Sequence, residues 1–273
     1  MMICGDFHTH TCFCDGKNTP EEMVSAAIAA GMTKLGFSGH SHTPFDESYC
    51  MSVTGTEEYK KEVRRLQEAY RGQLEIFLGV EQDYYGDAPS GDYDYVIGSV
   101  HYIHLGDEYI PVDEGNEKLK RAADAYFGGD ILCVCEAYYQ TVADIVNKTD
   151  CDIIGHFDLP TKYLEKEQIF DPSSPRYKKA WQAAADKLLQ AKVPFEINTG
   201  AMARGCRSTP YPAPEILSYL ASHGGTVVLS GDSHSAKTLR YAFDRCEKLV
   251  ASTGLTYRYP KKFGITPEGS PSP

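Results

Sequence analysis

The fold follows from one stretch near the N-terminus, Met2-Ile3-Cys4-Gly5-Asp6-Phe7-His8-Thr9-His10. Residues 2–7 form a short, mostly apolar run, which is typical of a buried β-strand. His8 and His10 follow at its end, and residues two apart on an extended segment point to the same side. Both imidazoles can therefore aim at one point, as two ligands of a metal ion would. A single pair of this kind is a weak signal, so its meaning depends on the rest of the chain.

The same arrangement recurs along the chain, where short apolar segments end in a histidine or an acidic residue. Five more segments end in this way, at His40/His42, Glu81, His101, His156 and Asp232/His234. Strand and helix patterns alternate about seven times, which predicts a parallel sheet with crossover helices. The expected strands are 2–7, 33–38, 73–81, 93–100, 151–155, 193–198, 226–230 and 255–259. The expected helices are 20–31, 54–70, 114–127, 130–146, 175–191, 214–223 and 235–252.

No change in composition divides the chain into two parts. We therefore predict a single α/β domain, a barrel over residues 1–264, followed by a flexible tail at 265–273 that is rich in Pro, Gly and Ser. In such barrels the functional residues gather at the C-terminal ends of the strands. Six strand ends that carry His, Asp or Glu predict a site with more than one metal ion.

The composition limits the partners. The chain has 273 residues and a net charge of −11, and its basic residues form no stripe, which argues against nucleic acid and favours a small or cationic substrate. No apolar run reaches the 18 residues of a membrane span, and the N-terminus lacks the pattern of a signal peptide. We expect a cytoplasmic protein with no membrane partner. The oligomeric state stays open.

Nine cysteines could suggest disulfides, but the number is odd and no export signal precedes them, so reduced thiols are expected. Cys133 and Cys135 lie in an apolar stretch and are assigned to the core. Cys12 and Cys14 lie close to the His8/His10 pair and could contact a metal. Their spacing is shorter than in the usual zinc-binding thiolate pairs.

Nine residues remain as metal-ligand candidates when His42 and His104 are set aside. They are His8, His10, Asp15, His40, Glu81, His101, His156, Asp232 and His234. Imidazole and carboxylate together suit zinc, iron or manganese, and nine ligands are too many for one ion. Two or three ions with bridging carboxylates would use them all. Metals about 3.5–4 Å apart hold a bridging hydroxide and clamp the oxygens of an in-line phosphoryl displacement. Hydrolysis of a phosphate ester is the reaction that most needs such a site.

As an ordered set, these motifs resemble the PHP (polymerase and histidinol phosphatase) superfamily over about residues 3–245. The motifs are His8-Thr9-His10, Cys14-Asp15-Gly16, Ser38-Gly39-His40, Gly79-Val80-Glu81, Gly98-Ser99-Val100-His101, Ile154-Gly155-His156-Phe157-Asp158, Asn198-Thr199-Gly200 and Ser230-Gly231-Asp232-Ser233-His234. Tyr138-Tyr139-Gln140 and the Gly-His-Phe-Asp segment look most like the histidinol-phosphatase branch. The resemblance implies a distorted seven-stranded (β/α) TIM-like barrel with three divalent metal ions.

The resemblance also implies a division of the ligands. The first ion would be held by His8, His10, Glu81 and Asp232. Glu81 would bridge to a second ion, completed by His101 and His156, and the third would be held by Asp15, His40 and His234. Two positions depart from the family pattern: many relatives have His at the position of Asp15, and an acidic residue where Gly39 stands. His42 is an additional histidine, which could orient a ligand or protonate the leaving alkoxide.

The activity implied by the resemblance is metal-dependent hydrolysis of L-histidinol phosphate, a step of histidine biosynthesis. Two cations are assigned to the phosphate. Arg204 follows a strand end, and Lys162 stands near the position where relatives often have an Arg. Arg207 is an alternative cation for the same role. Asp232 or His42 would handle protons. Groups that could recognise the amine and the imidazole are Asp158, Tyr138, Tyr139 and Glu136.

Three alternatives stay open from the sequence. One is a phosphoesterase of the same family that acts on another small mono- or diester, such as one derived from a nucleotide. The second is a nuclease or proofreading module, against which the negative charge argues. The third is a non-catalytic metal-binding or regulatory module. The ligand set does not distinguish zinc, manganese and iron.

Overall fold

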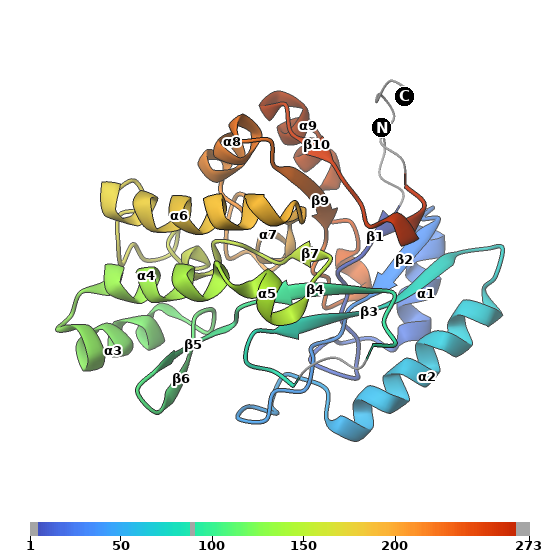
Figure 1. Ribbon diagram of the computed structural model, residues 1–273. Coiled ribbons are helices and arrows are strands. Elements are labelled where there is room, and N and C mark those ends of the chain that lie inside the picture. The colour runs from blue at the N-terminus through green and yellow to red at the C-terminus, as the bar shows by residue number, and fades with distance from the viewer. Residues whose placement is uncertain (1–4, 88–90, 266–273) are drawn as a thin grey trace.

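The computed structural model describes residues 5–87 and 91–265 of the chain (Figure 1). Residues 2–4 of the expected first strand lie outside the described residues, and so does the expected tail apart from Ile265. None of the described helices combines the length and the apolar composition that a membrane span needs.

The centre of the molecule is a curled sheet of eight parallel strands, in the order β1-β2-β3-β4-β7-β8-β9-β10. A separate antiparallel hairpin, β5–β6, follows β4. The strands are β1 (Gly5–Asp6), β2 (Lys34–Phe37), β3 (Glu75–Asp83), β4 (Tyr95–Ser99), β5 (Tyr102–Leu105), β6 (Glu108–Pro111), β7 (Ile153–Ile154), β8 (Phe195–Asn198), β9 (Thr226–Ser230) and β10 (Thr256–Tyr257). The expected α/β barrel architecture is thus confirmed as a strongly curved sheet.

The two sides of the curled sheet meet where β1 and β9 end. Thr9 and Ser233 form a parallel bridge there. Its backbone hydrogen bonds run from His10 N to Ser233 O (2.9 Å) and from Ser233 N to His8 O (3.0 Å). The eighth strand, β10, pairs only with the beginning of β9, at the opposite end. The bridge therefore brings the first and last ligand segments of the chain side by side.

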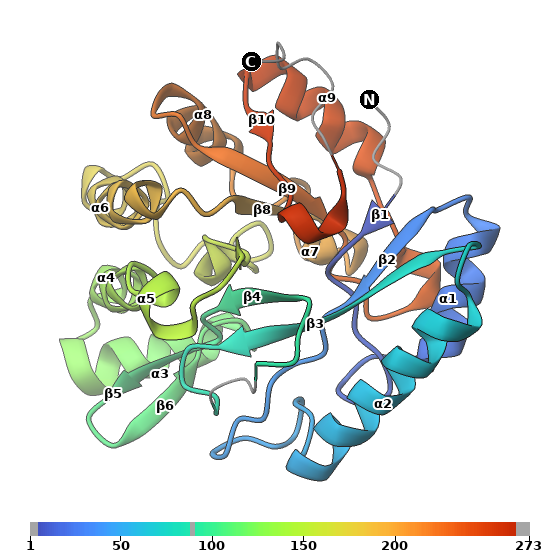
Figure 2. The same ribbon diagram turned by 45° about the vertical axis from the view of Figure 1, so that its right-hand side comes forward.

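Helices cover the outside of the sheet, as Figure 2 shows. They are α1 (Pro20–Ala29), α2 (Val53–Ala69), α3 (Asn116–Phe127), α4 (Ile131–Val142), α5 (Ile145–Thr149), α6 (Pro175–Ala191), α7 (Gly200–Ala203), α8 (Pro214–Ser222) and α9 (Phe243–Thr253), with short 3-10 turns at Leu159–Thr161, Ala236–Thr238 and Lys261–Phe263. The beginning of α1 has the expected signals, since Thr19 and Glu22 form a reciprocal capping box and Pro20 is the first helical residue.

Several element boundaries differ from the sequence-based expectation. Helix α2 begins earlier, because the Ser52 hydroxyl accepts from Gly55 N and caps it. The expected helix 130–146 is divided into α4 and α5. The expected helix 235–252 begins only at Phe243, because Arg240 and Ala242 have left-handed backbones and Arg240 N donates to the buried Asp6 carboxylate. The β5–β6 hairpin and α7 were not expected at all.

Tyr95 of β4 fills the interior of the barrel beneath the strand ends. Its hydroxyl donates to the carbonyls of Phe7 (2.6 Å) and Phe37 (3.1 Å), and its side chain is buried. Gly79 of β3 lies against the ring, and a Cβ atom at this position would come within 2.3 Å of it. The glycine two residues before Glu81 is therefore required by the packing of Tyr95.

We predict that Gly79→Ala lowers the free energy of unfolding by about 1–3 kcal/mol, the usual cost of overpacking a rigid core. Chemical denaturation monitored by circular dichroism measures the change. Gly91→Ala is the control, because a methyl group added at this position would meet no atom of the described residues within 4 Å. Equal stability of Gly79→Ala and the wild type would contradict the packing argument.

Candidate metal centre

The candidate ligands reach one place because parallel strands end at one rim of the sheet. His8 and His10 follow β1, His40 follows β2, and His101 follows β4. Further ligands follow β7 and β9, at His156, Asp232 and His234. Glu81 does not follow a strand end, because β3 continues to Asp83 and contains it. A parallel β-bridge joins Glu81 to His40. The rim therefore gathers side chains that are far apart in the sequence.

Glu81 is the centre of the cluster, and its side chain is only 1% exposed. Its Oε2 lies 3.1 Å from His8 Nε2, 3.4 Å from His10 Nε2 and 2.9 Å from His40 Nδ1. Its Oε1 lies 2.9 Å from His156 Nε2 and 3.4 Å from His101 Nε2. One carboxylate thus faces five imidazoles, with its two oxygens turned to different sets.

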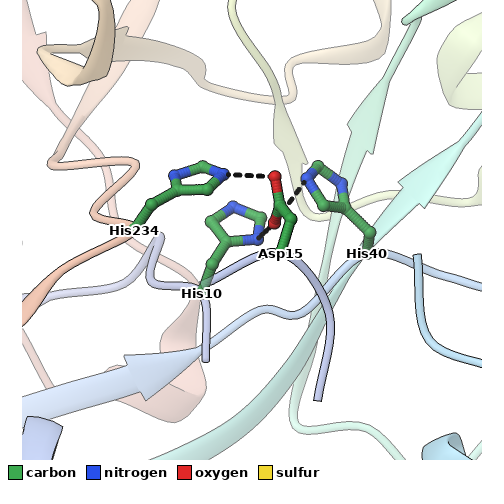
Figure 3. A group of neighbouring side chains, drawn as sticks. All are labelled: His10, Asp15, His40 and His234. Atoms are coloured by element: carbon green, nitrogen blue, oxygen red, sulfur yellow. Dashed lines mark ion pairs between the residues drawn. The ribbon is translucent and has the colours of Figure 1, made fainter. Parts of the chain in front are cut away.

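Asp15 is the centre of a second group, nearer the surface (Figure 3). Its carboxylate lies 3.1 Å from His234 Nε2, 3.6 Å from His40 Nε2 and 3.8 Å from His10 Nδ1. The loop that carries Asp15 is fixed by backbone bonds, including Gly16 N to Thr11 O. Four side chains from three chain segments therefore offer their ligand atoms within 4.8 Å of one another.

Asp232 completes the cluster from the end of β9. Its Oδ1 lies 3.4 Å from both His10 Nε2 and His234 Nδ1, and 3.9 Å from His8 Nε2. Arg204 donates to Asp232 Oδ2 at 2.9 Å. Burial by itself would raise the pKa of Asp232, but Arg204 and the neighbouring histidines hold it well below its usual value. The candidate ligand Asp232 is therefore ionised.

The donor atoms fit divalent metal ions. Three of them, His8 Nε2, His10 Nε2 and Glu81 Oε2, are fully buried and have no hydrogen-bond partner among the described residues. Buried polar atoms without partners are costly, so their convergence indicates a group that binds them. Burial and the charges of His234 and His40 lower the pKa of His10 to about 3, which keeps this imidazole neutral, as a ligand must be.

Two buried carboxylates behind the ligands were missed by the sequence analysis. Glu196 Oε1 lies 2.5 Å from His8 Nδ1, and Asp83 Oδ2 lies 3.1 Å from His101 Nδ1. Both acidic residues occur inside buried strands, which is the signal that could have identified them. A charged residue in such a place needs a buried partner.

The cluster opens into a pocket of about 440 Å³. Lys162 and Arg204 line it, as expected for phosphate-binding residues. Other residues of its wall were not expected: they are Tyr49, Tyr102, Asp113, Glu114, Leu159 and Tyr163. Tyr49 packs edge-on against His40, with 4.9 Å between the ring centroids. Sequence reasoning could not find these residues, because they come from loops and from the unexpected hairpin.

Other expected substrate-binding residues lie elsewhere in the structure. Asp158 is fully buried and accepts from Arg207, Thr161 and the Ala213 backbone. Arg207 is thus held by Asp158 and does not line the metal pocket. Tyr138 is buried and donates to the His156 carbonyl. None of these three residues lines the pocket beside the candidate ligands.

Three further candidates are engaged away from the pocket. Tyr139 bonds to the Tyr177 hydroxyl, and Glu136 pairs with Arg176 on the surface. His42 has Asp87 at 2.7 Å from Nδ1 and Glu47 at 3.2 Å from Nε2. The structure therefore does not bring His42 to the metal ligands, and its expected role as the acid for the leaving group loses its geometric basis.

The cysteines of the described ranges form no disulfide. Cys14 Sγ lies 3.5 Å from His10 Nδ1 and also donates to the Thr11 carbonyl, whereas Cys12 is exposed. Cys135 is buried in the core as expected, and Cys133 is only partly buried. Within the described residues, the groups of side chains that could hold a metal consist of histidine and carboxylate alone.

Comparison with known proteins identifies the family of the chain. The PHP domain family matches residues 6–200, and the chain belongs to this family. Among its relatives are a probable histidinol-phosphatase of Deinococcus radiodurans, 28% identical over 94% of this chain and 97% of the relative, and the histidinol-phosphatase of Bacillus subtilis, 25% identical over 88% and 96%.

Solved structures share the fold. A histidinol phosphate phosphatase from Lactococcus lactis, in complex with zinc, L-histidinol and phosphate, superposes with a TM-score of 0.70 at 20% identity, over 94% of this chain and 96% of that one. A putative histidinol phosphatase from Listeria monocytogenes has a TM-score of 0.74 at 18% identity, over 88% and 99%.

We predict that Glu81→Gln weakens metal binding by more than about 100-fold, because changes to residues outside the ligand shell already cost 10–100-fold. Titration calorimetry and metal analysis after dialysis measure the loss. Glu75→Gln is the matched control, since Glu75 begins the same strand but is exposed and pairs with Lys34. Wild-type metal content in Glu81→Gln would show that Glu81 holds no ion.

The pH dependence of metal binding gives a second prediction. Burial lowers the pKa of His8 and of His101, but the carboxylates beside them outweigh burial and raise both pKa values well above the usual 6.5. The raised pKa values favour protonation of both rings in the metal-free protein, so metal binding displaces protons from them. We expect the affinity to rise through the range from about pH 6 to about pH 8. Calorimetry in buffers of different ionisation enthalpy counts the protons, and an affinity that levels off above about pH 7 would contradict the raised pKa values.

Proposed function

We propose that this protein is a metal-dependent phosphatase that hydrolyses L-histidinol phosphate to L-histidinol and phosphate, a reaction of histidine biosynthesis. The observation that carries the proposal is the convergence of nine metal-ligand side chains on a pocket lined by Lys162 and Arg204. The similarity to histidinol-phosphatases over almost the whole chain supports the choice of substrate.

The proposed centre holds three divalent ions. The first set of ligands is His8, His10, Glu81 and Asp232, the second is Glu81, His101 and His156, and the third is Asp15, His40 and His234. The two oxygens of Glu81 face different histidines, which supports its role as a bridge. When bound, such ions stabilise charge on a phosphoryl group and supply a nucleophile at neutral pH.

The phosphate is proposed to bind between the centre and two cations. Arg204 is anchored to Asp232 by a side-chain and a backbone contact, which fixes its guanidinium at the pocket wall. Lys162 donates to Asp113 at 2.8 Å, and burial lowers its pKa less than Asp113 raises it, so the ammonium stays charged. Two fixed positive groups stabilise the charge that spreads over the phosphoryl oxygens.

The pocket wall also suits the alcohol part of the substrate. Histidinol carries an amine and an imidazole, and the wall offers the aromatic rings of Tyr49, Tyr102 and Tyr163 with the carboxylates of Asp113 and Glu114. Burial raises the pKa of Asp113, but Lys162 and nearby histidines lower it to about 2, so this carboxylate is ionised. Rings and ionised carboxylates together attract a cationic leaving group. These residues replace Asp158 and Tyr138 as the proposed contacts.

The test is phosphate release from L-histidinol phosphate by metal-loaded protein, compared with a panel of other monoesters and diesters. We expect the highest kcat/KM for L-histidinol phosphate. Lys162→Ala should raise KM about 10–100-fold, because a hydrogen bond to a charged group contributes roughly 1.5–3 kcal/mol. Lys166→Ala is the matched control, since both lysines lie over the Tyr163 ring but Lys166 does not line the pocket.

Two results would contradict the proposal. If metal-loaded protein hydrolysed another ester efficiently and left L-histidinol phosphate intact, the substrate would be wrong. If it hydrolysed none of the panel while holding its metals, a binding or regulatory role would replace catalysis.

A further inference from the structure

Strand β8 differs from the other central strands of the sheet. It lies between β7 and β9, which lead to His156 and to Asp232, yet it supplies no ligand of its own. Instead, Glu196 of β8 points into the barrel and is fully buried. A buried carboxylate needs partners that offset its lost hydration.

The partners of Glu196 are all hydrogen-bond donors. Oε2 accepts from the His156 backbone N–H at 3.1 Å and from Asn198 Nδ2 at 3.0 Å. Oε1 lies 2.5 Å from His8 Nδ1. Because Glu196 accepts from its two other partners, the geometry places the proton of this contact on His8 Nδ1. Glu196 therefore links one ligand of the first ion to the segment that carries a ligand of the second.

The other nitrogen of His8 is thereby directed to the metal site. His8 Nε2 is buried, has no hydrogen-bond partner among the described residues, and lies 3.1 Å from Glu81 Oε2 and 3.9 Å from Asp232 Oδ1. A proton fixed on Nδ1 leaves the Nε2 lone pair free for an ion. Carboxylates in this position fix the tautomer and the ring orientation and strengthen the ligand.

We infer that Glu196 is a positioning residue of the metal centre, which selects the Nδ1–H tautomer of His8 and so sets the affinity for the first ion. The inference rests on the metal centre and not on the identity of the phosphate ester. Asp83 has a comparable contact with His101, but the same Oδ2 also accepts from the His101 backbone N–H, whereas the two other donors to Glu196 both bind Oε2, so Glu196 is the cleaner case.

Glu196→Gln is the decisive variant. It preserves the shape of the side chain and replaces one acceptor oxygen by an NH2 group, which is a donor. In the variant, the amide oxygen of the new side chain keeps the place of Oε2, where it accepts from His156 N–H and Asn198 Nδ2. The opposite orientation would place the amide NH2 against these two donors and leave all three without an acceptor. The amide NH2 then faces His8 Nδ1, which must accept. The proton moves to Nε2 and blocks the lone pair that would bind the ion.

The experiment measures metal affinity directly, by titrating zinc or manganese into metal-free protein. We expect Glu196→Gln to raise the dissociation constant of one ion about 10–100-fold. Asn198→Ala is the matched control: it removes a buried neighbour from the same strand that contacts Glu196 and touches no imidazole. If both variants weaken binding equally, Glu196 acts only through the stability of β8 and the inference is overturned.

The tautomer of His8 is a second measurement, which would not change if Glu196 only stabilised strand β8. In protein with 15N-labelled histidine, at a zinc concentration that fills the first site of the wild type but not that of the variant, we expect His8 to carry its proton on Nδ1 in the wild type and on Nε2 in Glu196→Gln. Glu196→Asp keeps the charge but withdraws the carboxylate by one methylene, and it replaces Glu196→Gln if the latter does not fold. Wild-type affinity and an unchanged tautomer in a folded variant would refute the inference. Because no substrate is involved, this outcome is independent of whether L-histidinol phosphate is hydrolysed.

Discussion

The carboxylate of Glu81 is the constraint on which the site depends. It is almost completely buried, and five imidazoles from four different chain segments lie within 3.4 Å of its two oxygens. A buried charge without compensation would cost several kcal/mol. The segments around Glu81 must therefore be held in positions that keep their imidazoles next to its carboxylate. In the metal-free protein, protonated His8 and His101 supply that compensation, and divalent ions would replace them.

The barrel holds the segments in these positions through contacts that have no part in the chemistry. Tyr95 joins the carbonyls of Phe7 and Phe37 just below the rim, and Gly79 leaves room for its ring. The Thr9–Ser233 bridge joins the first and last ligand segments. Both contacts lie within a few residues of candidate ligands. The geometry of the centre therefore depends on the packing of the core.

The site is arranged in layers with distinct tasks. Ligand atoms face inward, and outer carboxylates such as Glu196 and Asp83 orient the imidazoles from behind. On the open side, Lys162 and Arg204 are each paired with an acidic residue, so both cations are held in place at the pocket wall. Preorganised charge of this kind needs little rearrangement during a reaction.

The sequence by itself determined the class of the fold and the set of candidate ligands. Strand–helix alternation predicted the parallel sheet, and because parallel strands end at one rim, His8, Glu81 and Asp232 could be assigned to one place from the sequence alone. Motif spacing also carried the family, which the match over residues 6–200 confirms. These inferences succeed because they depend only on local periodicity and on the chain's direction through the sheet.

Only the tertiary structure decided which residues surround the ligands. Asp158, Tyr138 and His42 were expected to take part in substrate binding or catalysis, but in the structure they are bound to other partners. Tyr49, Asp113 and Glu196 reach the site instead, from positions outside the ligand motifs. The helix expected at 235–252 begins late because a buried Asp6, more than two hundred residues away, binds its backbone. Side-chain direction in loops and the pairing of buried charges depend on long-range contacts, which local sequence patterns do not contain.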